Sequence, residues 1–116
     1  MASDDKNDKE TRALYFDGED ETKWEAWSLK TLAYAQKKGH AEAFTKTFEF
    51  GSDESKWTEA EKAHKVKMQA AWSQLALCVL GHALKSVMRV KSMDPKEAWD
   101  RLREEYELAE ITDVIN

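Results

Sequence analysis

The longest stretch of helical periodicity lies in the middle of the chain. Apolar and small residues recur over positions 58–80 at close to the 3.6-residue period of an α-helix. Thr58, followed three residues later by Glu61, forms a capping-box pattern, which satisfies two amide donors at a helix start. The stretch 75–80, LALCVL, is apolar on every face, so we expect other elements to surround it. The pattern predicts a central helix over 58–80 that ends or bends at Gly81.

A second periodic segment precedes the central helix. Thr22 and Glu25 form another capping-box pattern, and Gly39 stands where a helix cap is expected. Two lysines just before this glycine would lie in a last helical turn, where the helix dipole favours cations. These signals predict a helix over 22–38. The residues that share one face of this helix are Trp24, Trp27, Leu32 and Ala35.

Shorter elements flank these two helices. A short helix over 41–46 would turn Phe44 inward, and another over 82–90 would carry Leu84, Val87 and Met88. Asp94 followed by Pro95 is typical of a helix start and predicts a helix over 95–108. One face of that helix would consist of Ala98, Trp99, Leu102 and Tyr106.

The segments between the predicted helices are short. Residues 14–18, LYFDG, indicate an extended segment that packs on the domain and ends in a turn. Residues 49–56 are polar with one glycine and indicate an exposed loop. The final residues retain spaced apolar positions (Leu108, Ile111 and Ile115) where a further helix could begin.

Composition fits a compact helical domain. Of the 116 residues, 41% are hydrophobic and 35% charged, which is too apolar for complete disorder. Only four glycines and one proline argue against a turn-rich β-sandwich or barrel. We therefore expect an all-α fold, one compact domain of about five helices over residues 13–116. Residues 1–12, which are polar and acidic, are expected to form a disordered tail.

Charge and cysteine content limit the classes of binding partner and the compartment that we expect. The net charge of −5 gives the chain no general attraction for nucleic acid. No apolar run approaches the roughly 18 residues that a membrane span needs, so we expect no membrane partner. A single cysteine, Cys78, cannot form an internal disulfide and favours a reducing compartment.

Recognisable catalytic chemistry is absent from the pattern. The sequence contains no phosphate-binding glycine loop, nucleophile elbow or H-E-x-x-H zinc motif. His40, His64 and His82 lie far apart and lack metal-ligand spacing with Cys78. Cys78 lies in the most apolar segment, so we interpret it as a small buried hydrophobe. We expect no enzyme, cofactor or metal.

Two surface features leave alternatives open. His82, Lys85 and Arg89 recur on one side of a short helix, and Lys91 follows. This basic stripe is either a solvated face or a contact for RNA phosphates or for an acidic partner. Trp57, at the mouth of the polar loop, is the candidate for a surface or groove tryptophan, whereas Trp24, Trp72 and Trp99 fall on predicted inner faces.

The first long helix offers a candidate interface. Trp24 and Trp27, with Leu29 and Leu32, span an apolar arc wider than one core-facing stripe requires. We therefore expect Trp27 to help form a contact between chains. Lys85 and Arg89 would form its polar rim, facing acidic residues such as Glu19 and Glu21 of a neighbour.

Several blocks together resemble a known family. Phe16-Asp17-Gly18, with Trp24 eight residues after Phe16, and residues 96–106, which match K-E-A-W-D-x-L-x-x-x-Y, are similar to the Gag polypeptide of copia-type LTR retrotransposons. Between them, a Lys-Gly helix end at residues 38–39, a short helix and a long helix with an apolar centre follow the same order. The residues that carry the resemblance or its expected core are Phe16, Asp17, Gly18, Trp24, Gly39, Leu75, Ala98, Trp99, Leu102 and Tyr106.

The resemblance implies a structural function. Family members continue into a second helical lobe and a zinc knuckle that binds RNA, so these residues would correspond to the N-terminal capsid lobe. Such lobes self-associate into virus-like particles that package the element's RNA in the cytoplasm, with at most weak RNA binding by this lobe. The alternative is a domesticated Gag-derived adaptor that holds partner peptides in a helical groove, which an exposed aromatic groove near Trp57 or Trp24 would favour.

Overall fold

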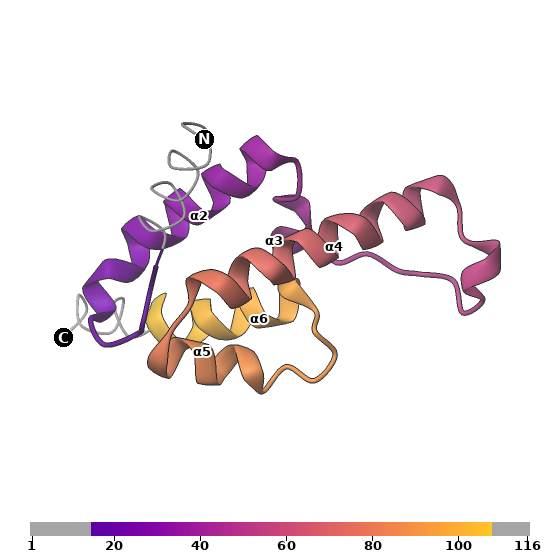
Figure 1. Ribbon diagram of the computed structural model, residues 1–116. Helices are drawn as coiled ribbons and strands as arrows, with labels where there is room; N and C mark the ends of the chain where they lie inside the picture. Colours follow the sequence, from indigo (N-terminus) through magenta and orange to yellow (C-terminus); the bar gives the residue numbers. More distant parts are fainter. Residues whose placement is uncertain (1–14, 108–116) are drawn as a thin grey trace, which may run out of the picture.

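The computed structural model of the protein describes residues 15–107 (Figure 1). This part of the chain contains five α-helices and no strand, which confirms the all-α prediction. The helices are α2 (Trp24–Lys38), α3 (Glu42–Thr45), α4 (Glu59–Cys78), α5 (Gly81–Met88) and α6 (Pro95–Leu102). The predicted tail over 1–12 and the apolar positions from Leu108 onward lie outside the described residues.

The start of α2 differs from the predicted capping box. A 3-10 turn, Glu21–Lys23, precedes the helix, and the Asp20 side chain accepts a hydrogen bond from the backbone N–H of Thr22 at 3.0 Å. The Thr22 hydroxyl also donates to Asp20. Thr22 is therefore part of an aspartate-capped turn and does not cap the helix itself, so the predicted capping box with Glu25 is wrong.

The predicted capping box of α4 is confirmed. The N–H of Glu61 donates to the Thr58 hydroxyl at 3.2 Å, and the N–H of Thr58 donates to the Glu61 carboxylate at 3.0 Å. The helix ends at Cys78, two residues before the predicted end, because the next residue, Val79, is extended and pairs with Phe16. This pairing confirms that the chain is extended within residues 14–18, as predicted. We call these residues the entry segment.

The expected burial of the LALCVL stretch is only half correct. Leu75 is fully buried, but Leu77 is 69% exposed. Within the described residues α4 packs mainly against α3 and α6, which cover one side of it. A helix segment that is apolar on every face can be buried on every face. The sequence does not determine how many neighbouring elements actually cover it.

The N-terminal half of α4 extends beyond the other helices (Figure 1). The segment 46–58, with a 3-10 turn at Glu54–Lys56, runs beside this half, and Lys67 near its end pairs with Glu42 of α3 at 3.7 Å. We call residues 46–67 the arm.

The last helix changes geometry near its end. Asp94 caps α6 by accepting from the N–H of Lys96 at 3.0 Å, and Pro95 occupies the first turn, as predicted. After Leu102 the chain continues as a π-helical turn, Arg103–Glu107. The wider turn carries Tyr106 into the core, where it is 4% exposed.

Candidate functional site

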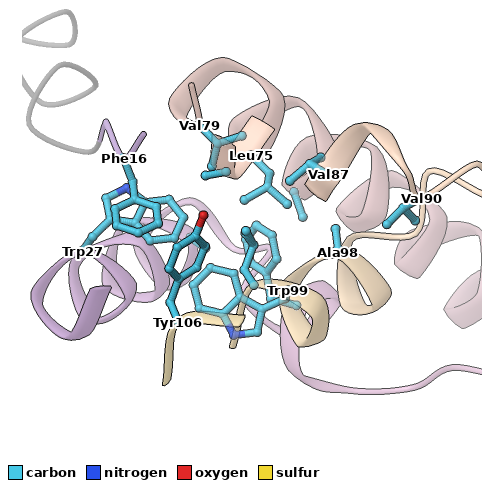
Figure 2. Close-up of a cluster of buried hydrophobic side chains, with 14 of the residues drawn as sticks. Phe16, Trp27, Leu75, Val79, Val87, Val90, Ala98, Trp99 and Tyr106 are labelled. Atoms are coloured by element: carbon cyan, nitrogen blue, oxygen red, sulfur yellow. The ribbon is translucent and has the colours of Figure 1, made fainter. Parts of the chain in front are cut away.

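The two segments that carry the family resemblance meet in one aromatic cluster. Phe16 lies edge-on to Tyr106 with ring centroids 5.0 Å apart, and Trp24 lies 5.5 Å from Trp99. Trp27 stacks on Phe16 at 5.0 Å. Figure 2 shows the Tyr106 ring between Phe16 and Trp99. Residues far apart in the sequence thus form the centre of the hydrophobic core, which we call the main cluster: Phe16, Trp24, Trp27, Phe44, Trp99 and Tyr106.

Gly18 allows the chain entry to pass close to Tyr106. Its φ is +80°, and a Cβ placed there would lie 2.2 Å from the Tyr106 hydroxyl oxygen. The carbonyl oxygen of Asp17 accepts from the N–H of Ala83 at 3.2 Å, and the Asp17 carboxylate accepts from the N–H of Glu19 at 2.9 Å. The Phe16-Asp17-Gly18 motif is therefore a turn that fixes the entry segment to the start of α5.

Tyr106 is held in its neutral form. Its hydroxyl group is buried and has no hydrogen-bond partner within the described part of the chain. Burial, and then the nearby carboxylates of Glu105, Glu21, Asp17 and Glu19, raises the pKa of Tyr106 to about 12. A phenol with this pKa is a poor proton acceptor or donor near neutral pH, so its position supports a packing role.

The other residues predicted for the core also lie inside the protein. Leu75, Ala98 and Leu102 are fully buried. Gly39 ends α2 with a φ of +93°, and its N–H donates to the end of the helix, as predicted from the sequence. The residues that carry the resemblance therefore build the core and the turns around it. Trp24 and Trp99 also line a small surface pocket of about 180 Å³, together with Leu32.

Trp27 is not available as a surface contact. Its side chain is 4% exposed and packs between Phe16 and Trp99. The predicted interface at Trp27 is therefore wrong, because Phe16 of the extended entry segment covers its ring. Leu29, on the same helix, is exposed.

Trp57 belongs to a second, smaller aromatic group. It packs on Phe50 at 4.8 Å, and its indole N–H donates to the Gly51 carbonyl at 2.7 Å. Phe48 stacks on His64 at 4.4 Å. We call Phe48, Phe50, Trp57 and His64 the arm cluster. Trp57 is thus half-buried within its own chain, which leaves little of the ring for a partner groove.

Two buried histidines have structural partners. Burial in the arm cluster lowers the pKa of His64, and the nearby Lys67 adds to this effect. His40 forms a hydrogen bond of 2.5 Å with the Gln74 side chain, and the Gln74 amide donates to the Thr31 carbonyl at 3.2 Å. Gln74 thus ties α4 to α2 and to the segment after it.

The predicted basic stripe is exposed on α5 and after it. Lys85 and Arg89 face solvent, as does His82. His82 lies 3.4 Å from the Glu19 carboxylate of the same chain, an ion pair only when the imidazole is protonated. Part of the acidic complement predicted to come from a neighbour is therefore supplied within the chain.

A groove between α2 and α4 was not predicted. It has a volume of about 360 Å³ and is lined mainly by Tyr34, Lys38, Ala70, Gln74 and Leu77. The LALCVL stretch already indicated such a surface. It contains more apolar residues than one buried helix face can hold, so some of them must be exposed.

Residues 15–107 place no three His, Cys, Asp or Glu side chains where they could hold a metal ion. Cys78 is buried, and burial raises the pKa of its thiol, which makes it a poor nucleophile. None of the helices in this range combines the length and apolar content that crossing a membrane requires.

Comparisons with protein-family models, with curated proteins and with solved structures find no match to this chain.

Proposed function

We propose that this domain is a structural subunit of the Gag type, corresponding to the N-terminal capsid lobe of copia-type LTR retrotransposons. In this function it self-associates into virus-like particles that package the element's RNA in the cytoplasm. The supporting observation is the meeting of the two resembling segments in the main cluster, through Phe16, Trp24, Trp99 and Tyr106. Because the motifs that carry the resemblance build the core, they specify the fold. A structural subunit with this fold would act through its surfaces.

The chemistry of the described residues favours a structural function over an enzymatic one. The perturbed tyrosine and cysteine are buried and have pKa values raised away from neutrality. The buried polar pair of His40 and Gln74 is hydrogen-bonded and ties helices together.

RNA contact by this lobe is expected to be weak. Lys85, Arg89 and Lys91 are exposed cations, but the acidic turn with Glu19 lies beside His82 at one end of the stripe. Affinity for phosphates depends on the number of cations that replace counterions, and this stripe supplies about four at most. Sub-micromolar RNA binding at physiological salt that Lys85→Glu with Arg89→Glu abolishes would contradict the proposal.

The second candidate is an adaptor lobe that binds partner peptides. The groove beside Tyr34 and Leu77 is the observation that favours it, since largely apolar grooves hold peptide anchors. The arm cluster gives less support, because the Trp57 ring already packs on Phe50 and donates to Gly51.

The experiment that separates the two candidates begins with the reading frame that encodes these residues. The frame is expressed whole and the product is examined by sedimentation and negative-stain electron microscopy. Regular shells that protect RNA from nuclease are expected. A soluble monomer that instead retains a peptide in the α2–α4 groove, with Leu77→Asp releasing it, would favour the adaptor. A frame that does not continue into protease, integrase and reverse transcriptase would count against a retrotransposon origin.

A further inference from the structure

An exposed stripe runs along the side of α4 that the core does not use. Its members recur at spacings of three, four, three and four residues, and all are exposed: Ala63, Val66, Ala70, Ser73 and Leu77. Val66 and Leu77 are the large members, with 64% and 69% of their side chains exposed. We call these residues the α4 stripe.

The spacing of the α4 stripe is that of a coiled-coil seam. Apolar residues that alternate at three and four positions stay on one line of a slightly supercoiled helix pair and pack between the side chains of the facing helix. The core-facing residues of α4, such as Ala71, Leu75 and Cys78, form a separate line. The helix therefore carries two apolar lines, and the fold covers only one of them.

We propose that the α4 stripe pairs with the same stripe of a second copy of this chain, with the two helices antiparallel. This inference deepens the proposed assembly function and rests on it. Reversing one copy places Val66 opposite Leu77 of the other copy and Ala70 opposite Ser73. A two-fold axis would then pass near the middle of α4, and the same patch serves both copies, as an isologous contact requires.

Side-chain size supports this pairing. The small residues Ala70 and Ser73 lie nearest the axis, where two helices approach most closely. Val66 and Leu77 pack outside them as apolar layers. Leu77 also borders the α2–α4 groove, so Tyr34 and Lys38 would flank the incoming helix along one edge.

Charge at the ends of α4 also favours a second copy. In this register Lys62 of one copy lies past the C-terminal end of α4 in the other copy, where the chain turns into α5 at Gly81. The Asp17 carbonyl oxygen lies 3.3 Å from the position of a Cβ on Gly81, so the acidic turn with Asp17 and Glu19 is adjacent. The exposed arm thus brings a lysine to an acidic turn, and the two-fold axis repeats the contact at the other end.

The area of the α4 stripe limits how strongly two copies can bind each other. From Ala63 to Leu77 the stripe is about 21 Å long and about one helix, roughly 10 Å, wide. This buries less than the roughly 800 Å² per partner of stable protein complexes. We therefore expect weak pairing between isolated chains, reinforced when many copies are held together in a shell.

Disulfide trapping tests the pairing and its direction. Two full-length variants, Ala70→Cys and Ser73→Cys, are mixed under mild oxidation, with the wild-type protein as the blank because Cys78 is buried. Ala76→Cys is the matched control, since Ala76 is exposed on the same helix but lies off the stripe. We expect the mixed 70–73 crosslink to form about tenfold faster than the 70–70 and 73–73 crosslinks and than crosslinks of the control.

Each alternative outcome overturns a definite part of the proposal. Preference for 70–70 and 73–73 crosslinks contradicts the antiparallel register. Rates equal to those of Ala76→Cys contradict the stripe as a contact between copies and leave the face to a different protein. Particle yield from the whole reading frame, measured for Leu77→Asp, separates this inference from the proposed function. Normal shells without 70–73 trapping would overturn the pairing alone, whereas trapping without shells would overturn the assembly function.

Discussion

The main cluster and the arm cluster are both aromatic, but they differ in what they connect. The main cluster joins the chain entry, α2 and the end of the described chain, with rings such as Phe16 and Tyr106 in contact across most of the sequence. The arm cluster joins residues within 46–67, and Trp57 in it is only half-buried. Aromatic content alone therefore does not define a core; the sequence separation of the contacts decides whether a cluster stabilises the fold or only a local segment.

This difference predicts two levels of stability. Rings that connect distant segments are lost only when the whole domain unfolds, whereas rings that connect neighbouring segments can separate while the core persists. The arm carries the N-terminal half of the α4 stripe, so its local stability also bears on the proposed pairing.

The largest expected effect is in the main cluster. Trp99→Ala removes a ring that contacts Trp24, Trp27 and Phe44. We expect a loss of about 3–5 kcal/mol in the free energy of unfolding, as for other large buried aromatics. Chemical denaturation followed by circular dichroism measures it. A denaturation midpoint equal to that of the parent protein would place Trp99 outside the cooperative core.

Gly18→Ala is expected to have the next largest effect on stability. The same substitution at two other glycines separates the contribution of the backbone conformation from that of the contact with Tyr106. Gly18→Ala is expected to cost about 1–3 kcal/mol, from a φ of +80° and from the contact with Tyr106. Gly39→Ala shares the positive φ but meets no atom within 4 Å, so it measures the backbone term. Gly51→Ala has neither feature and should change little. Equal losses at all three positions would contradict the close approach of the entry segment.

The contact part of the Gly18 effect should depend on the Tyr106 hydroxyl group. Tyr106→Phe is expected to be neutral or slightly stabilising alone, since that hydroxyl is buried without a partner in the described chain. Combined with Gly18→Ala it should recover part of the loss, because the atom that lies 2.2 Å from the new Cβ is removed. Strict additivity in the double-mutant cycle would show that the two residues do not touch.

Trp57→Ala should have a smaller and more local effect. The variant loses the packing on Phe50 and the hydrogen bond to Gly51, together worth about 1–2 kcal/mol. Because the ring is half-exposed, the loss should appear as easier proteolysis within 46–58 while the global unfolding midpoint moves little. A drop in the midpoint as large as that of Trp99→Ala would make the arm part of the main core.

The smallest effect is expected from pH. Burial lowers the pKa of His64, so the folded arm resists a proton that the unfolded chain accepts. Stability is therefore full above the ordinary histidine pKa of 6.5 and falls as pH drops below it. His64→Phe keeps a ring on Phe48 and should reduce this dependence between pH 7 and 5. A pH profile equal to that of the parent protein would contradict the assignment to His64.

Local signals predicted the elements well. The Thr58–Glu61 capping box, the Asp94-Pro95 start and the glycine at the end of α2 act through adjacent backbone groups, so the sequence carries them directly. Thr22 was misassigned because Asp20 competes for the same amide. That choice depends on the geometry of a 3-10 turn, which periodicity does not describe.

Predictions of exposure were less accurate for a physical reason. Trp27 was expected on the surface and Leu77 inside, yet the structure reverses both. An amphipathic pattern indicates that a face prefers burial, but which neighbour covers it depends on contacts such as Phe16 on Trp27, formed between distant segments. The α4 stripe was visible only as an excess of apolar positions, and its partner had to be inferred from the exposed face.

Native-state hydrogen exchange tests most directly whether the two clusters differ in stability. The N–H groups of Phe16 and Leu80 pair the entry segment with the end of α4, at 3.0 Å and 2.9 Å, and lie beside the main cluster. The N–H groups of Trp57 and Gly51 belong to the arm. We predict that Phe16 and Leu80 exchange only through global unfolding and that Trp57 and Gly51 exchange much faster, through local opening. Equal exchange rates at the two pairs would contradict the separation of core and arm.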